Sequence, residues 1–290
     1  MNQEWFEAGD LSRYLSDNDI VLLHNKMKST VWLIQSCESE RRIEGVEDYY
    51  ITGTGFCIGP HGSILTCDHN LASERTTVTC LGEGNDHTYN VRILRRLKIW
   101  DLAILKVVNE EDHPIEFHYV KFATERGEAV FVGEEVHSIG NPDELFRLLM
   151  NGRVVYPVEY VNVENITRRP LGNVAQKTLA DSHWSDNRTP WDITSDSGGN
   201  SYANALDRNL PLFQVSNYLV VEGGSGSPVF DNRGCVIGML QQFAGKYNFA
   251  IHFSILDRFV KDNRLNDGAG KRESGSSKLG TQQKKKKGRK

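Results

Sequence analysis

Short apolar segments alternate with polar turns along most of this chain. The apolar segments are rich in Val, Ile, Leu, Phe and Tyr, and Gly, Pro, Asn, Asp or Ser bounds each of them, which is typical of strands. Turn signals recur about every eight to twelve residues, a spacing that indicates an antiparallel all-β fold. The expected strands are 31–36, 49–58, 64–67, 76–81, 89–95, 101–107, 130–139, 153–163, 212–215, 235–242 and 247–253.

Two segments depart from this pattern. Residues 20–28 predict a short helix or turn that leads into the first strand. Residues 254–262 predict a closing helix, with Ser254 as its N-cap because a serine hydroxyl can accept a hydrogen bond from the first helical turn. Residues 109–125, interrupted by Pro114, are interpreted as a connection between two groups of strands.

A serine among small residues precedes one of the late strands, in the stretch E-G-G-S-G-S-P-V-F that contains Ser225. Glycines there allow a sharp turn whose N–H groups can face a ligand, as a nucleophilic serine with an oxyanion hole requires. Such a serine needs a base and a carboxylate that orients the base. His69 follows the strand I-L-T-C, and Asp101 begins the run D-L-A-I-L-K-V. The order His, Asp, Ser is that of chymotrypsin-type enzymes.

The segments G-T-G-F…I-L-T-x-x-H, D-L-A-I-L-K-V and G-G-S-G-S-P-V-F…G-x-V-I-G resemble the trypsin-like peptidase domain of the Deg/HtrA (Do-like) group. The resemblance runs roughly over residues 31–259. It implies a double barrel of the chymotrypsin type, made of two antiparallel six-stranded β-barrels. It also implies that His69 is the general base, Asp101 its orienting carboxylate and Ser225 the nucleophile, with the N–H groups of Gly223 and Ser225 forming the oxyanion hole.

A second serine must be weighed against Ser225. The tetrad D-S-G-G around Ser197 matches the trypsin motif more literally, but a polar, turn-like sequence follows it. Ser225 is followed by an apolar strand, a turn and a second apolar strand, which together can hold a strained nucleophile turn. We therefore assign Ser225. The residue before it, Gly224, stands where trypsin has an aspartate, so activation by propeptide cleavage is not expected. The sequence leaves open whether the oxyanion hole is preformed or forms only when substrate binds.

The predicted domain organisation has three parts. Residues 1–28 form a lead-in and residues 29–264 the peptidase domain, with barrels at about 29–108 and 128–264. Residues 265–290 form a disordered basic tail, because that stretch holds almost no large apolar residues. With so short a remainder, no PDZ domain is expected. The polar segment 165–209, which contains Trp184 and Trp191, is interpreted either as a lid or regulatory loop or as a disordered insertion.

The predicted activity is that of an intracellular serine endopeptidase acting on protein or peptide substrates. Extended substrate is expected to pair with the strand edge at Gln241, Gln242 and Phe243, and Leu219 is expected at the floor of the specificity pocket. No acid or base lies near that floor, which favours a medium apolar residue before the cleaved bond. The alternative is an inactive trypsin-like domain that acts as a protein-binding module. Hydrolysis of small esters is a weaker third possibility.

Composition limits the compartment and the cofactors. The chain of 290 residues has five cysteines, an odd number without regular spacing, which indicates reduced thiols inside the cell. Neither C-x-x-C nor H-x-x-x-H occurs, so neither a metal site nor a cofactor is expected. The first ten residues lack the features of a secretory signal, and no run is long and apolar enough to suggest membrane insertion. We expect the nucleus or cytoplasm.

Charge is divided unevenly along the chain. Residues 271–290 hold nine basic residues and one acidic residue, a net charge of +8, whereas the whole chain carries −4. Residues 1–270 therefore carry a net charge of −12. Specific nucleic-acid binding is not expected, because such domains usually present a basic surface. The segment K-K-K-K-G-R-K is interpreted as a signal bound by a nuclear import receptor, as a polyanion contact, or as a solubilising tail.

Overall fold

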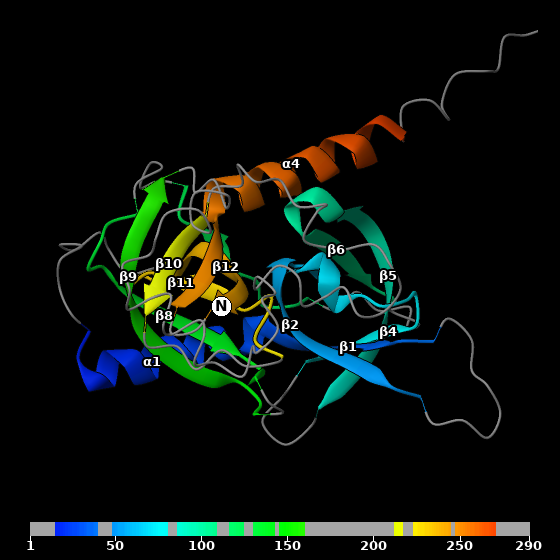
Figure 1. Cartoon of the computed structure of the whole chain (residues 1–290). Helices are drawn as coiled ribbons and strands as arrows, with labels where there is room; N and C mark the ends of the chain where they lie inside the picture. Colours follow the sequence, from blue (N-terminus) through cyan, green and yellow to red (C-terminus); the bar gives the residue numbers. More distant parts are fainter. Residues whose placement is uncertain are drawn as a thin grey trace, which may run out of the picture.

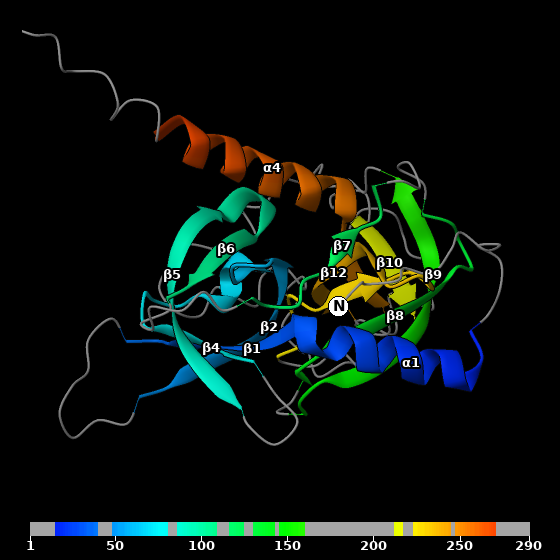
Figure 2. The same ribbon diagram turned by 180° about the vertical axis from the view of Figure 1, so that it is seen from behind.

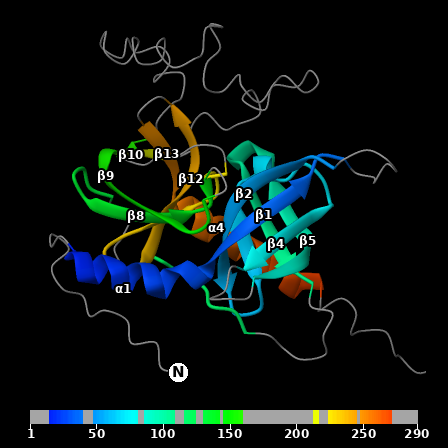
Figure 3. The same cartoon turned by 90° about the horizontal axis from the view of Figure 1, so that it is seen from below.

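Two closed β-barrels make up most of the described chain and lie side by side (Figures 1 and 3). The computed structural model describes residues 15–39, 48–80, 86–108, 116–124, 130–142, 145–159, 212–216, 223–244 and 247–270. The predicted all-β double barrel, with a helix after the second barrel, is confirmed.

The first barrel contains six antiparallel strands: β1 (Val31–Cys37), β2 (Tyr50–Gly59), β3 (Ser63–Thr66), β4 (Thr76–Cys80), β5 (His87–Leu97) and β6 (Leu102–Val107). Their order around the ring is β1-β2-β3-β6-β5-β4, and β1 closes the ring by pairing with both β2 and β4. Inward side chains fill the barrel, among them the fully buried Trp32 and Ile34. The ring of Trp32 packs edge-on against Phe117, with centroids 5.2 Å apart.

The second barrel also contains six antiparallel strands: β8 (Glu135–Gly140), β9 (Leu148–Glu159), β10 (Leu212–Ser216), β11 (Pro228–Phe230), β12 (Cys235–Ala244) and β13 (Tyr247–His252). Their order is β11-β8-β9-β10-β13-β12, closed by the pairing of β11 with β12. A short strand from the connection between the barrels, β7 (Lys121–Phe122), adds to β12 in parallel. The sequence pattern did not predict β7.

Two helices pack against the barrels, as Figure 2 shows from behind. Helix α1 (Asp17–Met27) places the buried Leu23 and Met27 against the core. Helix α4 (Phe253–Gly270) follows the second barrel and reaches the first. There the Arg95 guanidinium of β5 lies 4.4 Å from the centroid of the Phe259 ring and donates to the Phe259 carbonyl at 3.0 Å. Within the described ranges, no helix combines the length and apolar character needed to cross a membrane.

One apolar cluster is shared by both barrels. It joins Phe56, Leu65 and Leu102 of the first barrel to Ile139, Phe230 and Met239 of the second, and it also receives side chains from both helices. Because both barrels bury side chains in this cluster, their facing ends are held against each other. The loops at that junction carry the residues predicted to be catalytic.

Both helix starts differ from the sequence prediction. α1 begins at Asp17 because Ser16 is its N-cap, and Asp19 completes a capping box. α4 begins at Phe253, before the predicted N-cap Ser254. The ring nitrogen Nδ1 of His252 lies 3.3 Å from the main-chain N of Ser254 and accepts its hydrogen bond, so a histidine fills the capping role. α4 also continues to Gly270, and so residues 265–270, predicted to begin a disordered tail, are helical.

Two strands of the second barrel also differ. The predicted strand 130–139 is observed only as β8 from Glu135, because the chain turns at Gly133, where φ is +84°. That turn leaves Phe131 and Val132 exposed. β9 begins at Leu148, five residues before the predicted start, and it is described as far as Glu159. The predicted strand end at residues 160–163 lies outside the described residues.

Candidate active site

His69 lies on a single 3₁₀ turn directly after β3. The turn η2 (Asp68–Asn70) is closed by main-chain hydrogen bonds from Asn70 N to Cys67 O (3.3 Å) and from Leu71 N to Asp68 O (3.1 Å). The His69 side chain is 26% exposed, so its ring is accessible, while the turn fixes the main chain from which the ring projects. The sequence predicted His69 just past a strand, where it is found.

Asp101 occupies a left-handed backbone conformation between the 3₁₀ turn η3 (Lys98–Trp100) and β6. Its φ and ψ are 54° and 44°, a region that costs most L-residues about 1 kcal/mol but that Asp tolerates comparatively well. Its carbonyl accepts a hydrogen bond from Asp68 N at 3.1 Å, which links it to the His69 turn. The predicted strand 101–107 therefore begins one residue later, and Asp101 is the turn residue that precedes it. Backbone strain of this kind often marks functional sites.

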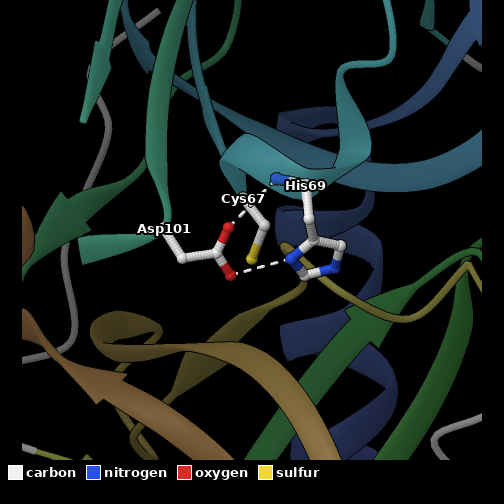
Figure 4. A group of neighbouring side chains, drawn as sticks. All are labelled: Cys67, His69 and Asp101. Carbon is white, nitrogen blue, oxygen red and sulfur yellow. Dashed lines mark hydrogen bonds and ion pairs between the residues drawn. The ribbon is translucent and has the colours of Figure 1, made fainter. Parts of the chain in front are cut away.

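The two side chains meet, as Figure 4 shows. His69 Nδ1 lies 2.8 Å from Asp101 Oδ2, and the main-chain N of His69 donates to Asp101 Oδ1 at 3.0 Å. Both carboxylate oxygens thus bind the histidine, one through the ring and one through the main chain. A carboxylate at Nδ1 holds the proton on that nitrogen, which leaves Nε2 as the acceptor in the neutral ring.

Opposing effects act on the basicity of His69. Burial of the ring on its own would lower the pKa of His69, because it disfavours the charged imidazolium. The negative charge of Asp101, its hydrogen bond to the ring and the charge of Asp68 together outweigh burial, so the pKa of His69 is raised above its usual value. Asp101 therefore stabilises the imidazolium that forms when His69 accepts a proton.

A third residue holds the carboxylate. Gln241, on β12, is 2% exposed, and its Nε2 donates to Asp101 Oδ2 at 3.1 Å. Its Oε1 is buried without a hydrogen-bond partner among the described residues. The sequence suggested Gln241 only as a strand-edge contact to substrate, which concerns its main chain and stays a prediction. Its side-chain role on Asp101 was not predicted, because the two residues lie 140 positions apart in the chain.

Asp68, the other carboxylate next to His69 in sequence, is engaged elsewhere. It is fully buried and accepts hydrogen bonds from the Arg96 guanidinium at both oxygens, the longer at 3.2 Å. Arg96 also donates to the carbonyl of Leu71 at 3.0 Å. This ion pair stabilises the turn that carries His69, while Asp101 is the carboxylate at the ring.

Ser225 lies in the turn that precedes β11, against the first barrel. Its carbonyl accepts hydrogen bonds from Thr54 N at 3.0 Å and from Asn70 Nδ2 at 2.9 Å. Its hydroxyl donates to the main-chain carbonyl of Gln241 at 2.9 Å. Ser225 therefore contacts Asn70, which follows His69 in the chain. It also contacts Gln241, which binds the Asp101 carboxylate.

Two further carbonyls of the serine turn accept hydrogen bonds from the protein. Gly223 O accepts from Thr54 Oγ1 at 2.8 Å, and Gly224 O accepts from Ser227 N and Oγ at 3.2 and 2.7 Å. Since C=O and N–H point in opposite directions across a trans peptide, the Ser225 N–H faces away from Ser227. Gly226 has φ +89°, and a Cβ there would lie 2.0 Å from Thr54 O, so this close approach requires glycine.

Cys67 is the third side chain in Figure 4. Its sulfur and the nearest ligand atoms of His69 and Asp101 all lie within 4.8 Å of one another. Burial raises the pKa of the Cys67 thiol well above its usual range, and the charge of Asp101 raises it further. The raised pKa favours a protonated thiol, which donates to Leu240 O at 3.5 Å. A metal ligand must instead be the thiolate, so these surroundings do not favour metal binding.

Several residues with predicted roles lie wholly or partly outside the described part of the chain. Leu219, Ser197 and the segment 165–209 lie outside the described residues, as does the chain from residue 271. Gln242 and Phe243 belong to β12, but their side chains also lie outside the described part. The roles predicted for them stay predictions.

The comparison with known families agrees with this arrangement. The family model described as "Trypsin-like peptidase domain" matches residues 53–239, a range that begins in β2 and ends in β12. It includes His69, Asp101 and Ser225. No curated protein matches the chain.

Proposed function

Because the chain belongs to the family of trypsin-like peptidase domains, we propose that it is a serine endopeptidase that cleaves protein chains through an acyl-enzyme. The observation that carries the proposal is the His69–Asp101 pair, joined at 2.8 Å beside the turn that bears Ser225. In this proposal His69 is the general base, Asp101 orients it and Ser225 is the nucleophile. The sequence motifs further support the Deg/HtrA type.

The first step requires the Ser225 hydroxyl to leave Gln241. A substrate strand that pairs with the β12 edge would bring its own N–H to the Gln241 carbonyl, which now accepts from Ser225 at 2.9 Å. Rotation about the Ser225 side chain then turns the hydroxyl toward Nε2 of His69. Substrate binding would in this way release the nucleophile to its base.

The chemistry then proceeds as acyl transfer. Ser225 Oγ forms a bond to the substrate carbonyl carbon while its proton passes to His69 Nε2, and Asp101 stabilises the imidazolium. The proton next passes to the leaving nitrogen as the C–N bond breaks, which leaves an ester on Ser225. A water molecule gives a proton to His69 and attacks that ester. The bond between Ser225 Oγ and the acyl carbon then breaks, the new carboxyl end of the substrate leaves, and His69 returns the proton to Ser225 Oγ.

The oxyanion of each intermediate would be bound by the N–H groups of Gly223 and Ser225. The carbonyls of Gly223, Gly224 and Ser225 already accept hydrogen bonds from Thr54, Ser227 and Asn70. Of the two alternatives that the sequence left open, these contacts support a turn that is held before substrate arrives. Preorganised donors cost little reorganisation during the reaction.

Hydrolysis of a protein substrate tests this function. Ser225→Ala should lower kcat/KM roughly 10⁴- to 10⁶-fold, because the nucleophile is lost while the half-buried site tolerates a smaller side chain. Ser197→Ala is the matched control and should keep most of the activity. Thermal melting checks that both variants fold. Equal activity of Ser225→Ala and the wild type would reject the proposal, and a wild type that binds but does not cleave protein would favour the binding-module alternative.

A further inference from the structure

The residue after the base reaches across to the nucleophile. Asn70 is 2% exposed, and its Nδ2 donates to the carbonyl of Ser225 at 2.9 Å and to Thr66 Oγ1 at 3.0 Å. Asn70 thus belongs to the turn that carries His69 and binds the main chain of the turn that carries Ser225. It is the side chain that joins these two turns directly in the described residues.

The orientation of the Asn70 amide follows from its partners. The Ser225 carbonyl can only accept, so the amide nitrogen must face it. Thr66 Oγ1 donates its own hydrogen to Thr54 O at 2.7 Å, so it too is left to accept from Asn70. Both partners therefore require the NH₂ end of the amide. The opposite amide orientation would bring two acceptors together in a buried site.

The neighbouring strand leaves space for this side chain. A Cβ built on Gly53 of β2 would lie 2.4 Å from Asn70 Cγ and 2.5 Å from its Nδ2. Glycine at residue 53 is thus what allows the amide to lie against β2 and reach Ser225. Space and hydrogen-bond partners both fix where the amide group sits.

The carbonyl that Asn70 binds belongs to Ser225, which supplies two groups to the proposed reaction. Ser225 supplies the nucleophilic oxygen and, through its N–H, one donor of the proposed oxyanion hole. Within the turn, Ser227 donates to the Gly224 carbonyl, whereas the donors to the Ser225 carbonyl come from the first barrel. Thr54 N at 3.0 Å and Asn70 at 2.9 Å are the two donors to the Ser225 carbonyl.

We propose that Asn70 is a positioning residue that ties the main chain of Ser225 to the turn of His69 and so sets the geometry between nucleophile and base. This inference rests on the proposed function, because its kinetic consequence requires Ser225 to act on substrate. Its structural part, the tether itself, can be measured without turnover.

Asn70→Leu is the test variant, because leucine has nearly the shape of asparagine but cannot donate a hydrogen bond. The untethered turn should lower kcat about 10- to 100-fold, since small misplacement of reacting groups has costs of this size, while KM changes less than about twofold. The pH midpoint of kcat/KM should stay unchanged because the His69–Asp101 pair is intact. Hydrogen exchange at the Gly226 and Ser227 amides, followed by mass spectrometry, should become about tenfold faster.

Ser138→Ala is the matched control. The buried Ser138 hydroxyl also donates to a main-chain carbonyl of this segment, Pro228 O at 2.8 Å, but from β8 of the second barrel. Its loss should leave kcat within about threefold of the wild type, because Pro228 carries no reacting group.

The possible outcomes separate the tether from the function. Unchanged exchange at the serine turn in folded Asn70→Leu would overturn the tether, whatever the activity. Faster exchange with an unchanged kcat would overturn the positioning role. A wild type that hydrolyses nothing, together with faster exchange in Asn70→Leu, would refute the proposed function while supporting the tether.

Discussion

At the scale of single residues, the site depends on how one carboxylate is held. Asp101 binds the main chain and the ring of His69 and also accepts from Gln241. Three donors fix its position, and its left-handed backbone directs it back toward the turn of His69. Asp101 therefore orients the ring of His69 and also contributes to raising its pKa.

The first prediction concerns pH. Only neutral His69 can accept the serine proton, so kcat/KM should rise with pH through the pKa of His69 in the free enzyme. Because the pKa of His69 is raised, the midpoint should lie above the value of about 6.5 typical of an unperturbed histidine. Asp101→Asn removes the charge that raises the pKa and should cost on the order of 10⁴-fold in kcat at neutral pH. An initial-rate pH profile measures both effects.

Two results would contradict this assignment. One is a variant Asp101→Asn that keeps a third of the wild-type activity, which would show that another group orients His69. The other is a wild-type midpoint clearly below the usual histidine value, which would mean that burial outweighs the charge of Asp101.

The sequence predicted the pair His69 and Asp101, but it did not predict the contacts that hold the pair in place. Each of the two residues follows or begins a recognisable apolar strand, so the local pattern is informative. Gln241 and Asn70 give no such signal, since their partners lie 140 and 155 positions away. Such contacts depend on how the two barrels are set against each other, which no local pattern contains.

At the scale of elements, strands were easier to predict than their ends. The apolar runs identified twelve of the described strands, but the chain turns at Gly133 inside one predicted run. The two-residue β7 is too short to leave a pattern. The start of α4 was missed because a histidine ring, rather than a serine hydroxyl, caps its first turn.

The second prediction concerns the packing of α4. Phe259 is fully buried in the shared core and lies under the Arg95 guanidinium of the first barrel. Phe259→Ala should lower the free energy of unfolding by about 3 to 5 kcal/mol, because it leaves a cavity between helix and barrel. Urea denaturation measures the change.

Lys261→Ala on the same helix is the control. The Lys261 side chain is 63% exposed and pairs with Asp257 one turn earlier. Its removal should change the free energy of unfolding by less than about 1 kcal/mol. Equal effects of the two substitutions would show that α4 does not bury Phe259 as described.

At the scale of the whole molecule, the two barrels act as one unit because they share a core. The double barrel followed from strand spacing together with three motifs in a fixed order, and the structure confirms it. The long polar segment between β9 and β10 has no repeating pattern of apolar residues that would indicate a strand or a helix. Its role as a lid or insertion stays a prediction.

The third prediction concerns the basic segment 271–290, which we propose to bind a nuclear import receptor. Truncation after Gly270 keeps the whole of α4, so activity and thermal midpoint should change little. A fluorescently tagged copy should move from the nucleus to the cytoplasm when the segment is removed. An unchanged nuclear signal in the truncated protein would reject the import role.

The proposed mechanism depends most directly on Ser225 being the nucleophile activated by His69 and Asp101. A fluorophosphonate probe reacts covalently with an activated serine, and digestion followed by mass spectrometry identifies the residue that carries the adduct. We expect one adduct, on Ser225, which is lost in Ser225→Ala, strongly reduced in Asp101→Asn and retained in Ser197→Ala. An adduct on Ser197 that persists in Ser225→Ala would contradict this mechanism.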